Sequence, residues 1–249
     1  MNPYLKVEKV EFVVTYACTG HCKHCSEGER VSCSSSIDPR VAADAVRKVA
    51  SAYPLKTVMA FGGEPLLCSE AVCAIMNAAL DCGVPRRQVI TNGYFSSDSS
   101  RIEKVATMLA ECGVNDLLVS VDAFHQETIP IDTVVEFIAA AVARGIPTRL
   151  SPAWLVSPTD DNHYNRRTRE ILDSFAGIDV TVGDGNVVFF EGNAKKYLAE
   201  YFDENTPENP YTQDPCEIKC LSIEPDGELL GENIYCNDVL DILKRYTPC

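Results

Sequence analysis

Short apolar runs alternate with helical segments along most of this sequence, and this alternation constrains the fold more than any other feature. The apolar runs are rich in β-branched and aromatic residues, which predicts strands at residues 10–14, 57–61, 89–91, 117–121 and 147–150. Capping residues and helical spacing predict helices between these strands, at residues 38–53, 69–83, 100–113 and 132–145. Strands and helices that alternate in this way form right-handed units around a parallel sheet.

The alternation becomes less regular beyond Trp154. Residues 171–175 are predicted to be helical and residues 187–190 to form a sixth strand. With this strand the chain has enough units for an α/β fold in which the sheet closes a partial (β/α)6 barrel or a full one.

The chain changes character near residue 206, where a segment rich in Pro and Asn is typical of a linker. Pro225-Asp226-Gly227 then marks a tight turn. The elements predicted around and after this turn are two strands of a β-hairpin and one closing helix, at residues 221–224, 228–230 and 239–246. We therefore expect two parts, a barrel over residues 1–205 and a small C-terminal module over residues 206–249.

Charge and composition exclude several classes of protein. The 249 residues contain 22 Lys and Arg against 36 Asp and Glu, so the net charge is −14. A surface this acidic repels phosphate groups, which argues against nucleic acid and anionic membranes as partners. No apolar run approaches the roughly 18 residues of a membrane span. An apolar content of 46% is that of a soluble globular protein.

The chain contains 12 cysteines, which is above ordinary usage. Its first residues lack the basic region and apolar stretch of a secretory signal. We therefore expect a cytoplasmic protein in a reducing compartment, where clustered cysteines are more often metal ligands or reactive thiols than disulfides.

Three of the cysteines follow the first predicted strand, with three and then two residues between them: Cys18, Cys22 and Cys25. Such close spacing suits one compact inorganic centre. A four-iron cubane usually has four cysteine ligands, so three would leave one iron open to a substrate. The alternative is a zinc site, in which His21 or His24 completes a tetrahedron with the three thiolates.

A second motif, Gly62-Gly63-Glu64-Pro65, follows the second predicted strand. The carboxyl ends of parallel strands meet at one edge of a sheet, where ligands gather, so this motif should lie near the cysteines. Its glycines expose backbone carbonyls and amides, and Glu64 can accept a hydrogen bond from an ammonium group. The plain alternative is an ordinary glycine turn.

Together the cysteine spacing, the Gly-Gly-Glu-Pro segment and the strand–helix rhythm between about residues 10 and 190 resemble the radical S-adenosylmethionine (SAM) superfamily. The resemblance implies a partial (β/α)6 radical SAM barrel. It also implies that the three cysteines bind a 4Fe-4S cluster whose fourth iron is chelated by SAM.

The resemblance further implies binding roles for individual residues. The SAM amino group would bind at Gly62, Gly63, Glu64 and Pro65. His24 stands where the family usually places an aromatic residue beside the adenine. Strand-end residues would surround the ribose and carboxylate, and a segment after the sixth strand would pass the adenine, which points to Asn92, Ser120, Asp122, Arg149 and Gly192. Asn92-Gly93 as a simple turn and Arg149 as a surface charge are the plain alternatives.

The C-terminal cysteines flank the predicted Pro-Asp-Gly turn, and this arrangement resembles the cluster-binding extensions called SPASM and twitch domains. The resemblance implies one auxiliary iron-sulfur cluster held by Cys216, Cys220, Cys236 and Cys249. The spacing from Gly227 to Cys236 is longer than usual, and the downstream cysteines of a full SPASM domain are missing. A degenerate tail with free or zinc-bound thiols is therefore the alternative.

The resemblance implies an oxygen-sensitive enzyme that cleaves SAM reductively and uses the 5'-deoxyadenosyl radical to abstract a hydrogen atom. Relatives with short cysteine-bearing extensions often modify ribosomally made peptides, so we expect a peptide substrate and an electron donor such as flavodoxin or ferredoxin. The first predicted strand begins at residue 10, which favours a separate partner for peptide recognition.

Other functions stay open at this stage. They are small-molecule biosynthesis of a cofactor, sugar or antibiotic, activation of a glycyl-radical enzyme, and a non-enzymatic zinc- or cluster-binding interaction module. The sequence singles out no catalytic side chain beyond the residues that bind cofactors.

Overall fold

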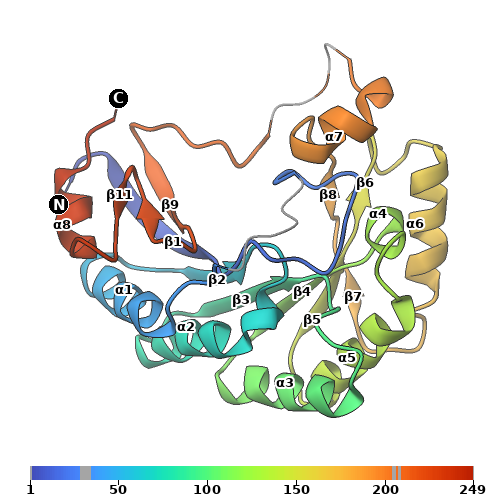
Figure 1. The fold of residues 1–249 in the computed structure, drawn as a ribbon, viewed down its shortest axis with the longest axis horizontal. Helices are drawn as coiled ribbons and strands as arrows, with labels where there is room; N and C mark the ends of the chain where they lie inside the picture. The colour runs from blue at the N-terminus through green and yellow to red at the C-terminus, as the bar shows by residue number, and fades with distance from the viewer. Residues whose placement is uncertain (1, 29–34, 204–205, 207–208, 249) are drawn as a thin grey trace.

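The computed structural model describes residues 2–28, 35–203, 206 and 209–248. Its main feature is a parallel sheet in the order β7-β5-β4-β3-β2-β1-β9, curved like an open barrel (Figure 1). The strands are β1 (Leu5–Val13), β2 (Thr57–Phe61), β3 (Arg86–Thr91), β4 (Asp116–Ser120), β5 (Thr148–Ser151), β7 (Thr181–Val182) and β9 (Ile218–Ile223). The predicted α/β partial barrel is therefore confirmed.

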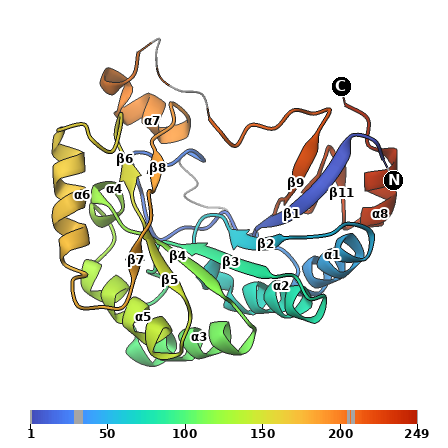
Figure 2. The same ribbon diagram turned by 180° about the vertical axis from the view of Figure 1, so that it is seen from behind.

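The long helices cover the outer, convex face of the sheet, as Figures 1 and 2 show from opposite sides. They are α1 (Pro39–Ala52), α2 (Ser69–Asp81), α3 (Ser99–Glu111), α5 (Ile131–Ala143) and α6 (His163–Asp173). Asp38 begins α1 as predicted, because its carboxylate accepts the backbone N–H groups of Arg40 and Val41. Short helical turns follow strands at η1 (Pro65–Cys68), α4 (Ala123–Gln126) and α7 (Gly192–Tyr197), and η2 (Ala199–Tyr201) follows α7.

The continuous apolar runs become strands that are covered on both faces. In β2, Val58, Met59 and Ala60 are each at most 5% exposed. Such a strand needs partners on both edges and apolar neighbours above and below, which the flanking strands and the outer helices supply. Of the described residues, no helix has both the length and the hydropathy that a bilayer span requires.

The predicted sixth strand does not belong to this sheet. Residues 186–187 form β8 (Asn186–Val187), which pairs with β6 (Ala153–Trp154) in a separate small sheet, and β7 takes the edge beside β5. Pro152 stands between β5 and β6. Because proline has no N–H to continue the ladder, the chain leaves the main sheet there.

The C-terminal hairpin forms one turn later than predicted. β9 joins the main sheet beside β1, and one backbone hydrogen bond of 3.1 Å, from the Glu224 N–H to the Glu228 carbonyl, crosses the turn at residues 225–227 without a ladder between β9 and the next strand. Instead β10 (Glu228–Leu229) pairs with β11 (Glu232–Asn233). The residues between them, Leu230 and Gly231, have φ of 53° and 80°, as a type I′ turn requires.

The predicted closing helix is present as α8 (Val239–Arg245). It packs against α1, and an ion pair of 2.8 Å joins Asp238 at its start to Lys48. The region therefore holds a hairpin and a helix as predicted, but its first strand extends the main sheet.

Candidate active site

The cysteine loop follows β1 and is held on one side by the Gly-Gly turn after β2. The N–H of Gly63 donates to the carbonyl of Thr15, and that of Glu64 to the carbonyl of Ala17, both at 2.8 Å. A Cβ atom added to Gly63 would lie 2.2 Å from the Ala17 oxygen. Only glycine permits this approach, so the two motifs predicted to meet do form one unit.

The start of α7 holds the other side of the loop. The backbone N–H of Asn193 donates to the Cys25 carbonyl at 2.9 Å, and its side-chain Nδ2 donates to the Cys22 carbonyl at 3.0 Å. Gly192 has φ of +48°, and an added Cβ would lie 2.4 Å from the Cys25 oxygen. Figure 1 shows the loop passing from the end of β1 towards α7. The structure thus brings Gly192 to the second half of the loop.

Two N–H groups point at the sulfur of Cys18. Nδ2 of Asn92 lies 3.6 Å from it, and the backbone N–H of Gly20 lies 3.4 Å from it. Asn92 follows β3, and its Oδ1 accepts the N–H of Tyr94 at 2.8 Å, which fixes the side chain. Donors of this kind tune metal-bound thiolates. Asn92 is therefore at the site.

Two thiols of the loop, those of Cys18 and Cys25, lie in an environment that disfavours free thiolates. Burial, with the charges of Glu64 and the neighbouring cysteines, raises the pKa of Cys18 to about 11. Burial and Cys22 likewise raise the pKa of Cys25. A bound cationic metal centre has the opposite effect on the thiol pKa, because it stabilises several thiolates at once. Cys22 is itself 8% exposed and packs with apolar side chains that include Phe124 and Leu155.

Glu64 serves as a fixed acceptor between two strand ends. Its carboxylate is fully buried and accepts hydrogen bonds from Thr91 Oγ1 at 2.7 and 2.8 Å, from the Leu66 N–H at 2.9 Å and from the Asn92 N–H at 2.8 Å. Although these bonds oppose it, burial raises the pKa of Glu64 to about 7. Pro65 begins η1, which Glu64 caps. The carboxylate thereby ties the Gly-Gly turn to Asn92.

Asp122 follows β4 and is completely buried. Its Oδ1 accepts the N–H groups of Phe124 and His125, and its Oδ2 accepts the Ala153 N–H at 3.0 Å. Oδ2 also lies 2.8 Å from Nδ1 of His125. Burial favours a protonated carboxyl, but the positive charge and hydrogen bonds of His125 outweigh it and lower the pKa of Asp122 to about 2.

Sequence reasoning missed His125. Burial opposes its protonation, yet the negative charges of Asp122 and Cys22 raise its pKa well above the ordinary value. Asp122 and His125 are three residues apart, which places them on one face of a helical turn. This spacing was the available signal, but α4 has only four residues and shows no periodicity.

His24 lies beside His125 and Phe124. Its ring centroid is 4.8 Å from those of both Phe124 and His125. Burial lowers the pKa of His24 to about 4, so the ring is neutral at pH 7. Nδ1 is buried without a hydrogen-bond partner in the described part of the chain. The His24 ring therefore packs against the aromatic side chains of α4.

Arg149 is not brought to the site, which corrects the prediction from its sequence position. Its Nη2 lies 2.8 Å from Asp116 Oδ1, and Arg86 pairs with the same carboxylate. Asp116 and Arg86 are the first residues of β4 and β3, so this network lies at the amino edge of the sheet, opposite the cysteine loop. Ser120 is the last residue of β4 and lies at the cysteine edge.

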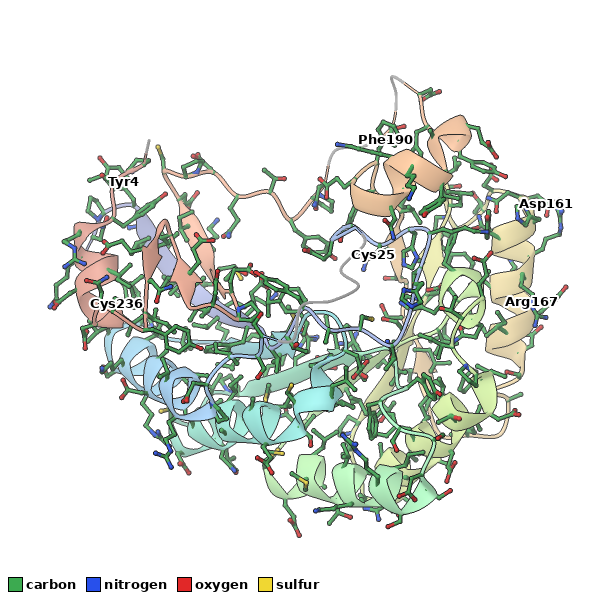
Figure 3. The ribbon with its side chains drawn as sticks, viewed as in Figure 1. Tyr4, Cys25, Asp161, Arg167, Phe190 and Cys236 are labelled. Atoms are coloured by element: carbon green, nitrogen blue, oxygen red, sulfur yellow. The ribbon has the colours of Figure 1, made fainter. Side chains whose placement is uncertain are left out.

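The C-terminal cysteines are arranged differently. Cys216 and Cys236 are exposed, and Cys220 lies within β9 opposite Lys9. Within the described ranges, the only group of three or more metal-ligating side chains with donor atoms all within 4.8 Å is Cys22, His24 and His125. Cys236 and Cys25 lie well apart in Figure 3. Cys249 lies outside the described residues.

The donor set of the loop fits an iron-sulfur cluster. Three thiols on one short loop, two of them with N–H donors or buried apolar packing around them, match the ligand chemistry of a cubane. Cubane ligands bind separate irons, so their sulfurs stand farther apart than the ligands of a single ion. The fold and this site together define a partial α/β barrel enzyme with a metal centre at the carboxyl edge of its strands.

The sequence profile of the Radical SAM superfamily matches residues 12–166, more than half of the chain, and the chain belongs to that superfamily. It is therefore an enzyme whose cofactors are a 4Fe-4S cluster and SAM, and not a non-catalytic binding module. No curated protein sequence matches the chain.

Solved structures of the same fold are similar over nearly the whole chain. Streptococcus suis SuiB bound to S-adenosylmethionine aligns with a TM-score of 0.63 at 11% identity, over 97% of this chain and 66% of SuiB. A histidine-tagged anSMEcpe with bound AdoMet aligns with a TM-score of 0.57 at 13% identity, over 93% of this chain and 75% of that protein. The chain thus spans slightly less than two thirds of the length of SuiB.

When bound, the reduced cluster supplies the electron that cleaves SAM. The chain's own residues prepare the place for it. Cys18, Cys22 and Cys25 would hold it, and the N–H groups of Gly20 and Asn92 donate towards the Cys18 sulfur. The buried apolar side chains around Cys22 exclude water from that side of the loop.

Proposed function

We propose that this protein is a radical SAM enzyme that abstracts a hydrogen atom from a ribosomally made peptide and so modifies it. The observation that carries the peptide assignment is the similarity of fold to native anSMEcpe with bound AdoMet and Kp18Cys peptide, with a TM-score of 0.54 at 12% identity, over 94% of this chain and 75% of that protein. The net charge of −14 suits a basic peptide.

The residues around the loop take roles within this proposal. Cys18, Cys22 and Cys25 bind the cluster, and the turn at Gly62 to Pro65 receives the SAM amino group. Asn92, Ser120 and Asp122 follow or end neighbouring strands at the same edge, and Gly192 closes the loop from the other side. The enzyme is cytoplasmic and takes its electron from a flavodoxin or ferredoxin, and a separate partner presents the peptide.

An auxiliary cluster in a twitch-like module over residues 206–249 is a second part of the proposal. Its support is the set of cysteines around β9 and the hairpin, Cys216, Cys220 and Cys236, together with Cys249. This part stands or falls independently of the first, because none of these residues belongs to the loop after β1.

Iron and sulfide counts after anaerobic reconstitution test both parts. A wild-type chain with about eight irons, against about four in a variant with Cys18, Cys22 and Cys25 all replaced by Ala, supports two clusters. About four irons falling to none supports the loop cluster alone. In a dithionite assay only wild type should form 5'-deoxyadenosine, and its formation by the variant would contradict the assignment of the loop.

The peptide assignment is tested with the same assay. A low-molecular-weight fraction of the lysate of the source cell should accelerate 5'-deoxyadenosine formation by the wild-type enzyme. Digestion of the fraction with a broad protease should abolish the acceleration. An accelerating activity that resists the protease would assign a small-molecule substrate instead.

A further inference from the structure

Two side chains of the cysteine loop and one from α4 bring possible metal-binding atoms close together. Donor atoms of Cys22, His24 and His125 all lie within 4.8 Å of one another. Zinc binds sulfur at about 2.3 Å and imidazole nitrogen at about 2.0–2.1 Å, so the ligands of one zinc ion stand a few ångströms apart. The group therefore has the dimensions of a site for a single ion, and it differs from the three-cysteine set of the loop.

Asp122 orients His125 as a metal ligand. Its Oδ2 lies 2.8 Å from Nδ1 of His125, which leaves Nε2, on the side of Cys22, as the nitrogen that would bind a metal. Histidine ligands of zinc almost always donate their other N–H to a carboxylate or carbonyl in this way. The carboxylate is itself fixed by the N–H groups of Phe124 and Ala153, so the orientation of the ring is built into the fold.

His24 supplies an independent observation. Its Nδ1 is buried and has no hydrogen-bond partner in the described part of the chain. An unsatisfied buried polar atom costs free energy, and a metal ion bound through this nitrogen would remove that cost. One thiolate and two imidazoles are a donor set that zinc accepts, with one tetrahedral position left for water.

We propose that Cys22, His24 and His125 bind one Zn²⁺ ion when the loop carries no iron-sulfur cluster. Zn²⁺ binds Cys22 as the thiolate and His125 through a neutral Nε2, so the protons that these groups carry are released to solvent, and no oxidation state changes. If Cys22 is a cluster ligand, as the proposed function holds, zinc and the cluster exclude each other because both need its sulfur. The metal supply then decides whether the chain can assemble an active centre.

The test titrates the cluster-free, full-length chain with Zn²⁺ in competition with a chromophoric chelator. Wild type should bind one ion. The double variant Cys18→Ala with Cys25→Ala should bind it with unchanged affinity, although it cannot assemble the loop cluster. His125→Ala should weaken binding more than about 100-fold and Asp122→Asn about 10- to 100-fold. Circular dichroism checks that each variant is folded, and His125→Gln is a second, more conservative variant at the same position.

Cobalt gives a second readout. Co²⁺ in place of zinc should show a thiolate-to-metal charge-transfer band of the intensity expected for one sulfur, unchanged in the double variant. Loss of zinc in the double variant together with retention in folded His125→Gln would overturn the proposal and place the ion on the three cysteines. Because the double variant cannot assemble the loop cluster, its zinc affinity reports on this site even if SAM cleavage is never observed.

Mutual exclusion is measured separately. A chain preloaded with one equivalent of Zn²⁺ should take up about four fewer irons on reconstitution than the zinc-free chain, and a chelator should restore uptake. Iron uptake that is unaffected by bound zinc would show that the two sites do not share Cys22.

Discussion

The chain carries cysteines in two regions, and among the described residues the two regions differ in how other elements surround the thiols. The loop after β1 is held by backbone contacts from the turn after β2 and from the start of α7, with Asn92 aimed at Cys18. In the C-terminal region, Cys216 and Cys236 are exposed. The number of cysteines is similar in the two regions, so what distinguishes a centre is the convergence of other elements on its ligands.

Position along a parallel strand explains the difference. β9 runs parallel to β1, so its carboxyl end lies at the same edge as the loop. Cys216 precedes β9 and therefore lies towards the amino edge, and Cys220 is the third residue of the strand. What reaches the loop is Glu224, which follows β9 and accepts a hydrogen bond of 2.6 Å from the Tyr16 hydroxyl. The C-terminal region thus braces the loop, and Cys216, Cys220 and Cys236 are not the residues that reach it.

Single substitutions in the two regions give the largest expected contrast. Cys22→Ser should reduce 5'-deoxyadenosine formation by at least about 100-fold, because one of the three thiolates of the loop is removed. Cys236→Ser should leave the rate within about twofold, because this side chain is exposed and lies well apart from Cys25 (Figure 3). The assay uses anaerobically reconstituted protein and dithionite. A comparable loss in both variants would mean that the C-terminal region takes part in SAM cleavage.

Alkylation of the cluster-free chain tests whether the reactivity of a thiol follows its burial or the cysteine region to which it belongs. The pKa of Cys18 is about 11, and burial with the charge of Glu11 raises that of Cys220 to about 12. Both thiols are therefore almost wholly protonated at pH 8. Iodoacetamide should label them more than about 100-fold faster in the unfolded chain, where the pKa is about 8.5. Labelling of exposed Cys236 should change only a few-fold.

The alkylation rates of the buried thiols should increase with pH. Since pH 8 to 10 lies below the raised pKa values, the labelling rates of Cys18 and Cys220 should rise about tenfold per pH unit over this range. Peptide mass spectrometry follows each site. Slow labelling of Cys236 in the folded chain would indicate that the C-terminal cysteines are also enclosed, and the contrast between the regions would fail.

Glycine substitutions test whether the loop is held as described. Gly63→Ala places a Cβ against the Ala17 carbonyl oxygen and should cost roughly 3 kcal/mol or more, with loss of most of the roughly four irons of the loop cluster. The matched control is Gly83→Ala at φ +70°, where no atom lies within 4 Å of the added Cβ, so only backbone strain of about 1 kcal/mol is expected. Equal iron retention in the two variants would show that the contact at Gly63 does not hold the loop.

Much of the fold is predictable because strands and helices have local signals. The range expected for β2 matches the structure, as do both ends of α1, where a capping Asp38 and Pro39 precede the helical pattern. The wrong predictions concern which strands pair with each other. β9 pairs with β1, which is more than 200 residues earlier in the chain, and no local pattern encodes that choice. Residues 187–190 are apolar, but β7 takes the edge beside β5, and Val187 pairs with Trp154 of β6 instead.

The site shows the same division. The cysteine spacing and the two glycines lie within short segments, and the sequence alone brings them together through the shared edge of a parallel sheet. His125 escapes notice because its role depends on contacts with Asp122 and Cys22. Arg149 misleads because the position of a residue on a strand does not say which edge its long side chain reaches. Here the carboxylate of Asp116 draws it to the amino edge.

The smallest expected effect tests the other side of the loop. Asn193→Ala removes the donor to the Cys22 carbonyl, which lies beside a buried side chain, and should lower the free energy of unfolding by roughly 1–2 kcal/mol. For a chain of this size that is a fall in Tm of about 2–8 °C in a thermal melt. The Asn193→Ala variant should also lose iron faster to a chelator.

The matched control is Asn237→Ala. The exposed Asn237 side chain donates to the Asn233 carbonyl at 3.3 Å in the C-terminal region, so its loss should change the free energy of unfolding by less than about 0.5 kcal/mol. Equal shifts in the two variants would mean that α7 does not hold the loop, and that the two cysteine regions differ less in their support than their contacts indicate.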